Sequence, residues 1–405
     1  MLYAHLPLMM FVFAFGAAVG SFINVVIYRL PAGMSVTTPP SRCPTCGARL
    51  RFFRENLPIL GWFLVRGKCR YCGVPISPQY MVIELVMALA FLGLYCLFYV
   101  VPQDVTWIGG IGSEWWHGTG RFISDPGFFR TWPVFIAIVF MVAALIAMTV
   151  IDARTFTIPI EIPLFITVTA FLAYTIQGFL PLHSRQPLLW PIPAGDWRVF
   201  AVGLGGMAGV LIGVAMLRLG MLRYSFADYH QYVEKDQVLG DYPHARREML
   251  VEILFLLPCL IGIAAGWFVG GFLPSGVPPV VVQSLGGSMA GYLVGGGMIW
   301  GIRILGTFAF GREAMGLGDV HLLAAVGAVM GMVDPILVFF IAPFSGLVWH
   351  FGATGFAAML KRARRELPYG PHLAVGTLIV LLGRPGVEWV QSMYLPWLPL
   401  PGLLP

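Results

Sequence analysis

Long apolar runs alternate with short polar loops along most of the chain, and ten of these runs are candidates for helices that cross a bilayer. A bilayer core of about 30 Å needs about 20 mostly apolar helical residues. The eighth run is short, and the last is interrupted by Arg384 and Pro385. The pattern predicts an all-α polytopic membrane protein of about 8–10 spans, at residues 7–27, 80–101, 132–151, 160–180, 199–217, 251–273, 280–305, 320–333, 336–360 and 372–390.

The composition excludes a water-soluble globular protein. Only 11% of the 405 residues are charged and 58% are apolar, whereas soluble domains carry about 25% charged residues. A disordered chain would need low hydrophobicity and high net charge. The formal net charge of +6 could indicate nucleic-acid binding, but the basic residues concentrate in short loops between apolar runs. Because such loops orient membrane proteins, we expect membrane lipid as a partner and no nucleic acid.

The basic residues predict which loops face the cytoplasm. The loop at residues 29–79 holds eight Lys and Arg residues and a single acid, Glu55, so we expect it to be cytoplasmic. Alternation from this loop places four further loops on the same side, at residues 152–159, 218–250, 306–319 and 361–371. The last of these contains the basic cluster Lys361, Arg362, Arg364 and Arg365, which agrees with the predicted orientation.

The first cytoplasmic loop carries two Cys-x-x-Cys pairs, formed by Cys43, Cys46, Cys69 and Cys72. Four thiolates in two such pairs are typical of a closed tetrahedral Zn²⁺ site. Two disulfides are the alternative, but the reducing cytoplasm disfavours them. Because four sulfurs leave no open position, the zinc is expected to be structural and to fold a loop too short for its own core. The expected units are a first helix (1–28), a zinc module (29–79) and a membrane domain that carries the site (80–405).

Two acids, Asp152 and Asp319, lie at the cytoplasmic ends of predicted spans. An Asp in a span costs roughly 2.5–3.5 kcal/mol, so each is expected to have a function. Four predicted spans separate them, and an even number returns the chain to the same side. Two carboxyls within a few ångströms cannot both ionise easily, so one can act as an acid and the other as a base. Such a pair can activate water and protonate a peptide carbonyl, as aspartic proteases do.

Several glycines also carry predictions. Gly316 and Gly318 precede Asp319, and because glycine permits positive φ and close backbone approach, we expect them to contact an extended substrate. Two further glycine strings lie inside predicted spans, at residues 203–209 and 287–295. Without a preceding strand they are typical of helix packing rather than of nucleotide binding.

Several motifs, taken in order, resemble the type IV prepilin peptidases, also called prepilin leader peptidases/N-methyltransferases, which are GxGD-type intramembrane aspartic proteases. The resemblance covers most of the chain. It rests on the cysteine pairs and on the segments Gly20-Ser-Phe-Ile-Asn24, Pro78-Gln-Tyr80-Met-Val-Ile-Glu84, Glu313-Ala-Met-Gly316-Leu-Gly318-Asp319 and Tyr369-Gly-Pro-His-Leu-Ala374.

The resemblance implies an enzyme that removes the basic leader of type IV prepilin or type II secretion pseudopilin precursors at the cytoplasmic face of the bacterial inner membrane. It implies that Asp152 and Asp319 are the catalytic pair and that the four cysteines bind metal. Many members then methylate the new N-terminus with S-adenosylmethionine, and a peptidase without this activity remains an alternative. Glu84 could contact the substrate or the methyl donor, or simply pair with an Arg near the interface.

Some positions depart from the family pattern. Arg154 and Ile160 stand where the family often has further Asp residues, so neither can assist Asp152, and His321 replaces a usual Lys. An extra pair of spans lies between the two aspartates, and its connecting loop is expected to be a solvated amphipathic linker.

Two other functions remain open from the residues alone. One is a proton-coupled transporter, which is disfavoured because both acids lie at one rim and no repeat is evident. The other is a membrane scaffold whose zinc module docks partners.

Overall fold

The computed structural model describes residues 2–100, 127–180, 192–228, 242–360, 368–383 and 393. This described part is helical, without a strand, and contains two isolated bridges that join Arg42 to Arg49 and Lys68 to Pro75. Eight of its helices are long and apolar enough to cross a membrane, and two more are shorter and apolar. The predicted fold class is confirmed, since each of the ten predicted runs coincides with one of these helices.

The ends of the helices lie close to the predicted ends of the runs. In chain order they are α1 (Leu2–Arg29), α2 (Phe52–Glu55), α3 (Leu60–Leu64), α4 (Gln79–Tyr99), α6 (Phe128–Thr155), α7 (Glu161–Phe179), α8 (Trp197–Arg218), α10 (Ala245–Gly270), α11 (Val280–Phe310), α12 (Leu317–Met330), α13 (Asp334–Leu360) and α14 (Tyr369–Leu382). Helices α12 and α14 have 14 residues each, too few to cross a full bilayer core alone. Residues 384–390 of the last predicted run lie outside the described residues.

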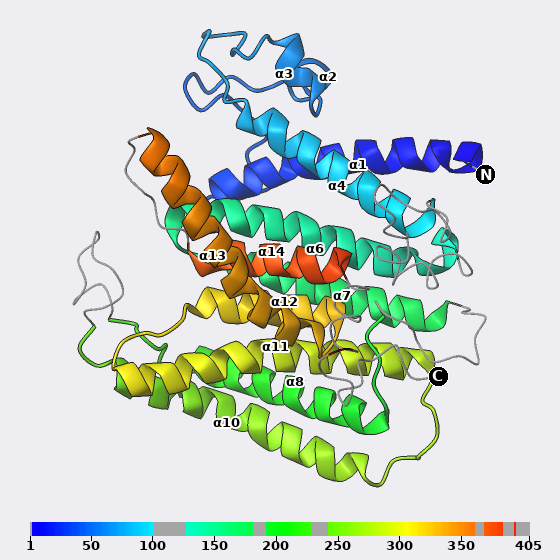
Figure 1. Ribbon diagram of the computed structural model, residues 1–405, viewed down its shortest axis with the longest axis vertical. Helices are drawn as coiled ribbons and strands as arrows, with labels where there is room; N and C mark the ends of the chain where they lie inside the picture. The colour runs from blue at the N-terminus through cyan, green and yellow to red at the C-terminus, as the bar shows by residue number, and fades with distance from the viewer. Residues whose placement is uncertain are drawn as a thin grey trace.

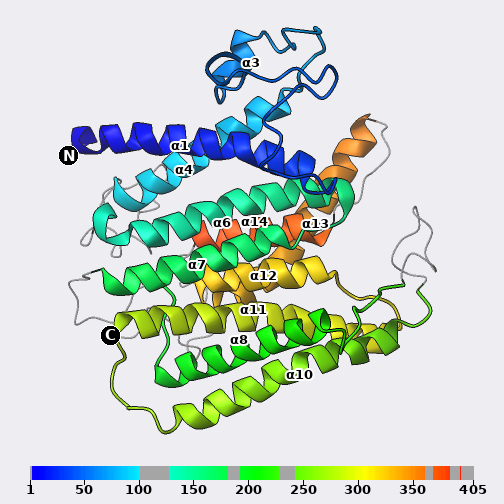
Figure 2. The same cartoon turned by 180° about the vertical axis from the view of Figure 1, so that it is seen from behind.

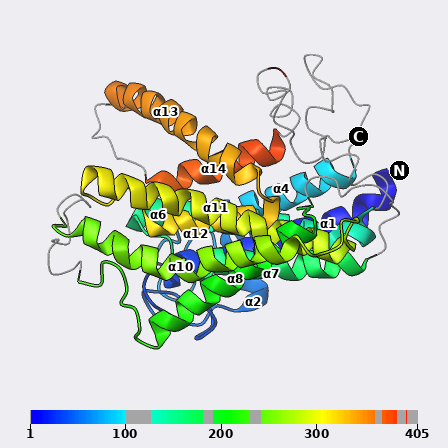
Figure 3. The same ribbon diagram turned by 90° about the horizontal axis from the view of Figure 1, so that it is seen from below.

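The long helices lie side by side in a row, with α1 and α4 at one edge and α8 and α10 at the other (Figure 1). The small helices α2 and α3 lie beyond the α1 edge, and the view from behind shows the same order (Figure 2). Helices α13 and α14 cover one face of the row (Figure 3). The main core includes buried side chains of α1, α4, α6, α7, α12 and α14, whereas α8 and α10 contribute none of its buried residues.

The predicted glycine strings do pack helices. A Cβ on Gly205 of α8 would collide with the backbone of Gly262 on α10, and Gly291 of α11 meets the backbone of Gly327 on α12 in the same way. Small residues let helix backbones approach closely inside a membrane. The prediction of helix packing rather than nucleotide binding is therefore confirmed at these two contacts.

Contacts between helix ends place several predicted cytoplasmic loops at one rim. Arg154, near the end of α6, donates a hydrogen bond to the side chain of Gln79, the first residue of α4. Arg246, near the start of α10, donates to the carbonyl of Phe308 near the end of α11 at 2.9 Å. These contacts fit the predicted alternation of the loops.

The expectation of a solvated amphipathic linker is met only in part at the end of the 218–250 loop, where Arg246 and Arg247 are exposed but other residues are buried. Tyr242 is 4% exposed and Glu248 only 1%. The carboxylate of Glu248 pairs with the guanidinium of Arg223 at 2.5 Å, so the returning chain docks against the segment that leaves α8. A buried acid of this kind is retained because a cation compensates its charge. Residues 229–241 of the loop lie outside the described part.

Candidate active site and metal centre

Asp152 lies in the last turn of α6, and its side chain is 4% exposed. The helix ends three residues later, where Phe156 adopts a left-handed backbone with φ of 55° and donates its N–H to the Asp152 carbonyl at 2.9 Å. The carboxylate accepts a hydrogen bond from the backbone N–H of Gly370, at the start of α14. This buried acid is therefore held by a segment that lies more than 200 residues away in sequence.

Asp319 lies in the first turn of α12 and is 9% exposed. Gly316 caps this helix, and its backbone N–H donates to the Asp319 carboxylate. An acidic side chain three residues after the cap commonly satisfies the free N–H at a helix start, and the helix dipole favours negative charge there. The G-x-G-D sequence thus fixes the position of its own carboxylate.

The structure brings the two aspartates together. Their carboxylates are close enough to repel each other electrostatically. Ile158, six residues after Asp152, packs against Gly318 and also lies near Gly370. The ends of α6, α12 and α14 therefore meet at one point, and the phenol of Tyr369 is within electrostatic reach of Asp319. Two buried carboxyls that interact in this way cannot both ionise easily.

An ionic cluster that sequence analysis missed supports the Asp319 loop. Arg303 of α11 is 1% exposed, and its Nη2 pairs with Glu252 of α10 at 2.9 Å. Its Nη1 donates to the carboxylate of Glu313 and to the carbonyl of Met315, which lies in the turn before Asp319. Arg303 and Glu252 both fall inside predicted spans, so the rule that flagged the aspartates also applies to this pair.

The unusual His321 belongs to the same region. Its ring lies edge-on to Trp300, with 6.5 Å between the ring centroids, and the indole Nε1 of Trp300 donates to Glu252 at 2.7 Å. Arg154 and Ile160, the other departures from the family pattern, behave differently. Arg154 contacts Gln79, and the side chain of Ile160 is 53% exposed.

The structure revises the reason for the two glycines before Asp319. Neither adopts a positive φ, and Gly316 has φ of −69°. A Cβ on Gly318 would lie 2.9 Å from the Cβ of Ile158, so this position needs glycine for close packing. A Cβ on Gly316 would meet only the Asp319 carboxylate, at 3.4 Å. Contact of either glycine with a substrate stays a prediction.

Glu84 lies in the second turn of α4 and faces the zinc module. Its carboxylate accepts the backbone N–H of Ile59 at 2.6 Å. Ile59 has φ of 63° and ψ of −58°, and the N–H of Leu60 reaches back to the carbonyl of Pro58 at 2.6 Å. This is a γ-turn with positive φ, a rare and strained conformation for a β-branched residue. Such strain is concentrated at functional sites.

The four predicted metal ligands converge. All four sulfurs lie within 4.8 Å of one another. The Cys43 and Cys72 sulfurs are 3.8 Å apart, and those of Cys46 and Cys69 are 3.9 Å apart. A tetrahedral Zn²⁺ with Zn–S bonds of about 2.3 Å has edges of about 3.8 Å. The donor set therefore fits zinc, and these distances are far longer than a disulfide bond of about 2.05 Å.

The two cysteine pairs have the same local geometry. In each, the N–H of the first cysteine is bonded to the carbonyl five residues later, and a glycine at φ of 70° follows the second cysteine, Gly47 in one pair and Gly73 in the other. Glycine adopts this left-handed conformation without steric cost. The backbone N–H groups of Cys46 and Thr45 donate hydrogen bonds to the Cys43 sulfur, which favours the thiolate that metals bind.

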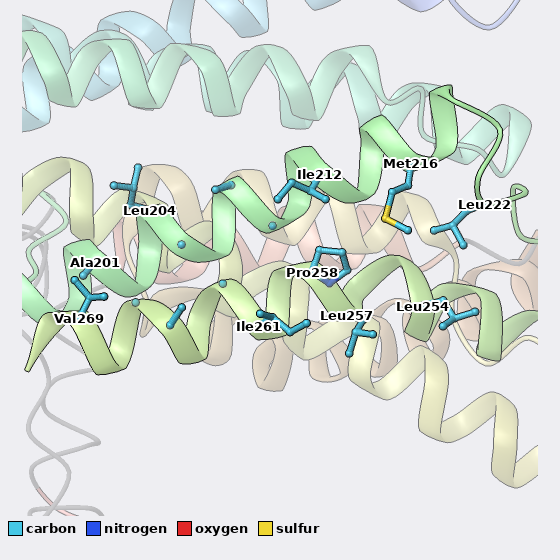
Figure 4. Close-up of a pocket in the computed structure, with 16 residues that line it drawn as sticks. Ala201, Leu204, Ile212, Met216, Leu222, Leu254, Leu257, Pro258, Ile261 and Val269 are labelled. Atoms are coloured by element: carbon cyan, nitrogen blue, oxygen red, sulfur yellow. The ribbon is translucent and has the colours of Figure 1, made fainter.

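A groove of about 670 Å³ lies between α8 and α10 (Figure 4). Every residue that lines it is apolar, including Leu204, Met216, Leu257 and Ile261. It offers no acid, base or hydrogen-bonding side chain, so it cannot perform the chemistry of the aspartate pair.

Comparison with known proteins agrees with this geometry. Residues 14–98 match the family described as Bacterial Peptidase A24 N-terminal domain. A prepilin leader peptidase/N-methyltransferase of Myxococcus xanthus is 51% identical over 81 residues, a match that covers 20% of this chain and 24% of that protein.

Other relatives match over nearly the whole chain. The prepilin leader peptidase/N-methyltransferase of Aeromonas hydrophila is 25% identical over 411 residues, covering 95% of this chain and 94% of that protein. A type 4 prepilin-like proteins leader peptide-processing enzyme of Escherichia coli is 23% identical and covers 90% of each. No solved structure matches the chain. The chain is therefore similar to bacterial prepilin leader peptidases/N-methyltransferases over most of its length, at 23–25% identity.

Proposed function

We propose that this protein is an intramembrane aspartic endopeptidase that removes the basic leader from type IV prepilin or pseudopilin precursors at the cytoplasmic face of the bacterial inner membrane. The observation that carries the proposal is the meeting of two buried acids, Asp152 and Asp319, from helices far apart in sequence. The names of the relatives supply the class of substrate.

In the proposed reaction, the two carboxyls share one proton. The ionised carboxylate takes a proton from a water molecule, whose oxygen attacks the scissile carbonyl carbon, while the protonated carboxyl donates its proton to the carbonyl oxygen. Collapse of the resulting diol breaks the C–N bond and transfers a proton to the leaving amine. The products are a leader with a new carboxylate and a mature chain with a free N-terminal amine.

We further propose that the protein methylates this new amine. S-Adenosylmethionine, when bound, supplies an electrophilic methyl group to an amine nitrogen. The role proposed for Zn²⁺ is structural, because four cysteine ligands leave no position for water or substrate.

The test is processing of a co-expressed prepilin by Asp152→Asn and Asp319→Asn variants, read by the size of the product. Both substitutions keep the shape and remove the charge, so each should abolish cleavage while the protein remains in the membrane. Asp196→Asn is a matched control, because Asp196 only caps α8, accepting the N–H of Val199 at 2.7 Å, and Asn caps helices equally well. Full cleavage by either site variant refutes the proposal.

A further inference from the structure

A cavity of about 780 Å³ lies between the zinc module, the end of α1 and the start of α4. Cavities of 300–1,000 Å³ are typical of sites for small ligands. Its walls combine hydroxyl and amide side chains with three aromatic residues, Tyr28, Trp62 and Tyr80. The cavity therefore has the size and the mixed lining of a binding site for an organic molecule.

The charged residues of the wall are balanced. Glu55 and Glu84 supply two carboxylates, and Arg29 and Arg42 supply two guanidinium groups. A purely anionic ligand would face the two acids, and a purely cationic one would face the two arginines. A ligand that carries both an ammonium and a carboxylate, as an α-amino acid does, can pair with both signs.

Glu55 is the second independent observation. It is the single acid of the 29–79 loop, among eight basic residues, and it lines the cavity. Its Oε2 accepts the N–H of Arg51 at 2.9 Å, while its Oε1 is buried and has no hydrogen-bond partner among the described residues. A buried carboxylate oxygen without a partner is costly, and a bound cation removes that cost.

Glu84, the other acid, is held in place by the strained turn at Ile59 described above. Tyr80 lines the cavity and directly follows Gln79, which is bonded to Arg154, two residues after Asp152. One side-chain contact between α4 and α6 therefore links the wall of the cavity to the helix that carries Asp152.

We propose that this cavity binds the methyl donor, a zwitterionic amino acid joined to an aromatic base. Glu55 and Glu84 pair with its positive groups, the two arginines with its carboxylate, and the aromatic side chains contact its purine. The assignment rests on the proposed function, because only a methyltransferase requires such a donor.

The experiment measures binding of S-adenosylmethionine to the full-length, zinc-loaded protein in detergent by equilibrium dialysis. Binding is expected, and Glu55→Gln or Glu84→Gln should each weaken it about 10-fold or more, since each loses one charge-assisted hydrogen bond. Glu161→Gln, an exposed acid at the start of α7, is the matched control and should bind like the unaltered protein. Zinc content and melting temperature show that each variant is folded.

A second arm uses adenosine, which lacks the amino-acid part, and a peptide with a basic leader. Adenosine should bind far more weakly than S-adenosylmethionine, and its affinity should not change in the Glu55→Gln variant. The assignment fails if folded protein does not bind the donor, or if both glutamate variants bind it normally. It also fails if only the leader peptide loses affinity in the variants. Because binding requires no cleavage, failure here leaves the peptidase proposal standing, and failure of the aspartate test leaves this one standing.

Discussion

Arg303 of α11 donates hydrogen bonds from Nε to both carboxylate oxygens of Glu252 on α10, at 3.1 and 3.0 Å, although 51 residues separate the two in sequence. The same guanidinium holds the carbonyl of Met315, in the turn that precedes Asp319. The extra helix pair between the two aspartates is therefore connected to the candidate active site by a buried ion pair.

This ion pair predicts a large loss of stability when one partner is removed. Glu252→Gln leaves the buried charge of Arg303 less compensated, and removal of one partner from a buried pair costs about 3–5 kcal/mol. Denaturant unfolding in detergent measures the change. Arg198→Gln is the control, since Arg198 lies over the Trp267 ring at 4.7 Å on an exposed surface and should cost about 0.5–1 kcal/mol. A loss for Glu252→Gln no larger than the control would contradict the structural reading.

Gly370→Ala is expected to impair cleavage. An added Cβ would lie 2.5 Å from Oδ2 of Asp152 and 3.2 Å from Cδ1 of Ile158, so the carboxylate must move. A displacement of about 1 Å at a reacting group can cost about 100-fold in rate. Prepilin processing by purified protein gives the rate. Gly297→Ala of α11, where nothing lies within 4 Å of the added Cβ, should process at the unaltered rate.

The two glycines before Asp319 should respond differently to alanine. Gly318→Ala places a Cβ 2.9 Å from the Cβ of Ile158. Neither Cβ can move without a shift of the backbone, so this substitution should reduce processing strongly. Gly316→Ala fits its φ of −69° and makes an ordinary contact, so it should be much milder. Equal loss in the two variants would instead indicate that Gly316 contacts the substrate directly.

Removal of the metal should unfold the zinc module and leave the membrane helices folded. Metal binding supplies on the order of 10 kcal/mol in small zinc modules. Cys43→Ser, or a strong chelator, should therefore abolish bound zinc, measured by elemental analysis, and expose the 29–79 loop to protease. Cys259→Ser, at a buried cysteine of α10 far from the cluster in sequence, should retain the zinc. Protection of the loop in the zinc-free protein would show that it folds without metal.

The sequence by itself determined the helices and the metal ligands. A span is set by the local length of an apolar run, and the sulfurs of a Cys-x-x-Cys pair are placed by a single turn, so neither depends on distant residues. Asp152 and Asp319 could also be identified from the sequence, because an acidic residue next to a long apolar run is costly in a membrane whatever its neighbours in the fold.

Only the tertiary structure decided what meets these residues. Gly370 against Asp152, Ile158 against Gly318 and Arg303 against Glu252 are contacts between helices that no local spacing encodes. The cavity beneath the zinc module likewise exists only where the ends of α1 and α4 meet the loop. Which residues line this cavity depends on how the helices pack, and the order of residues along the chain does not show which distant residues come into contact.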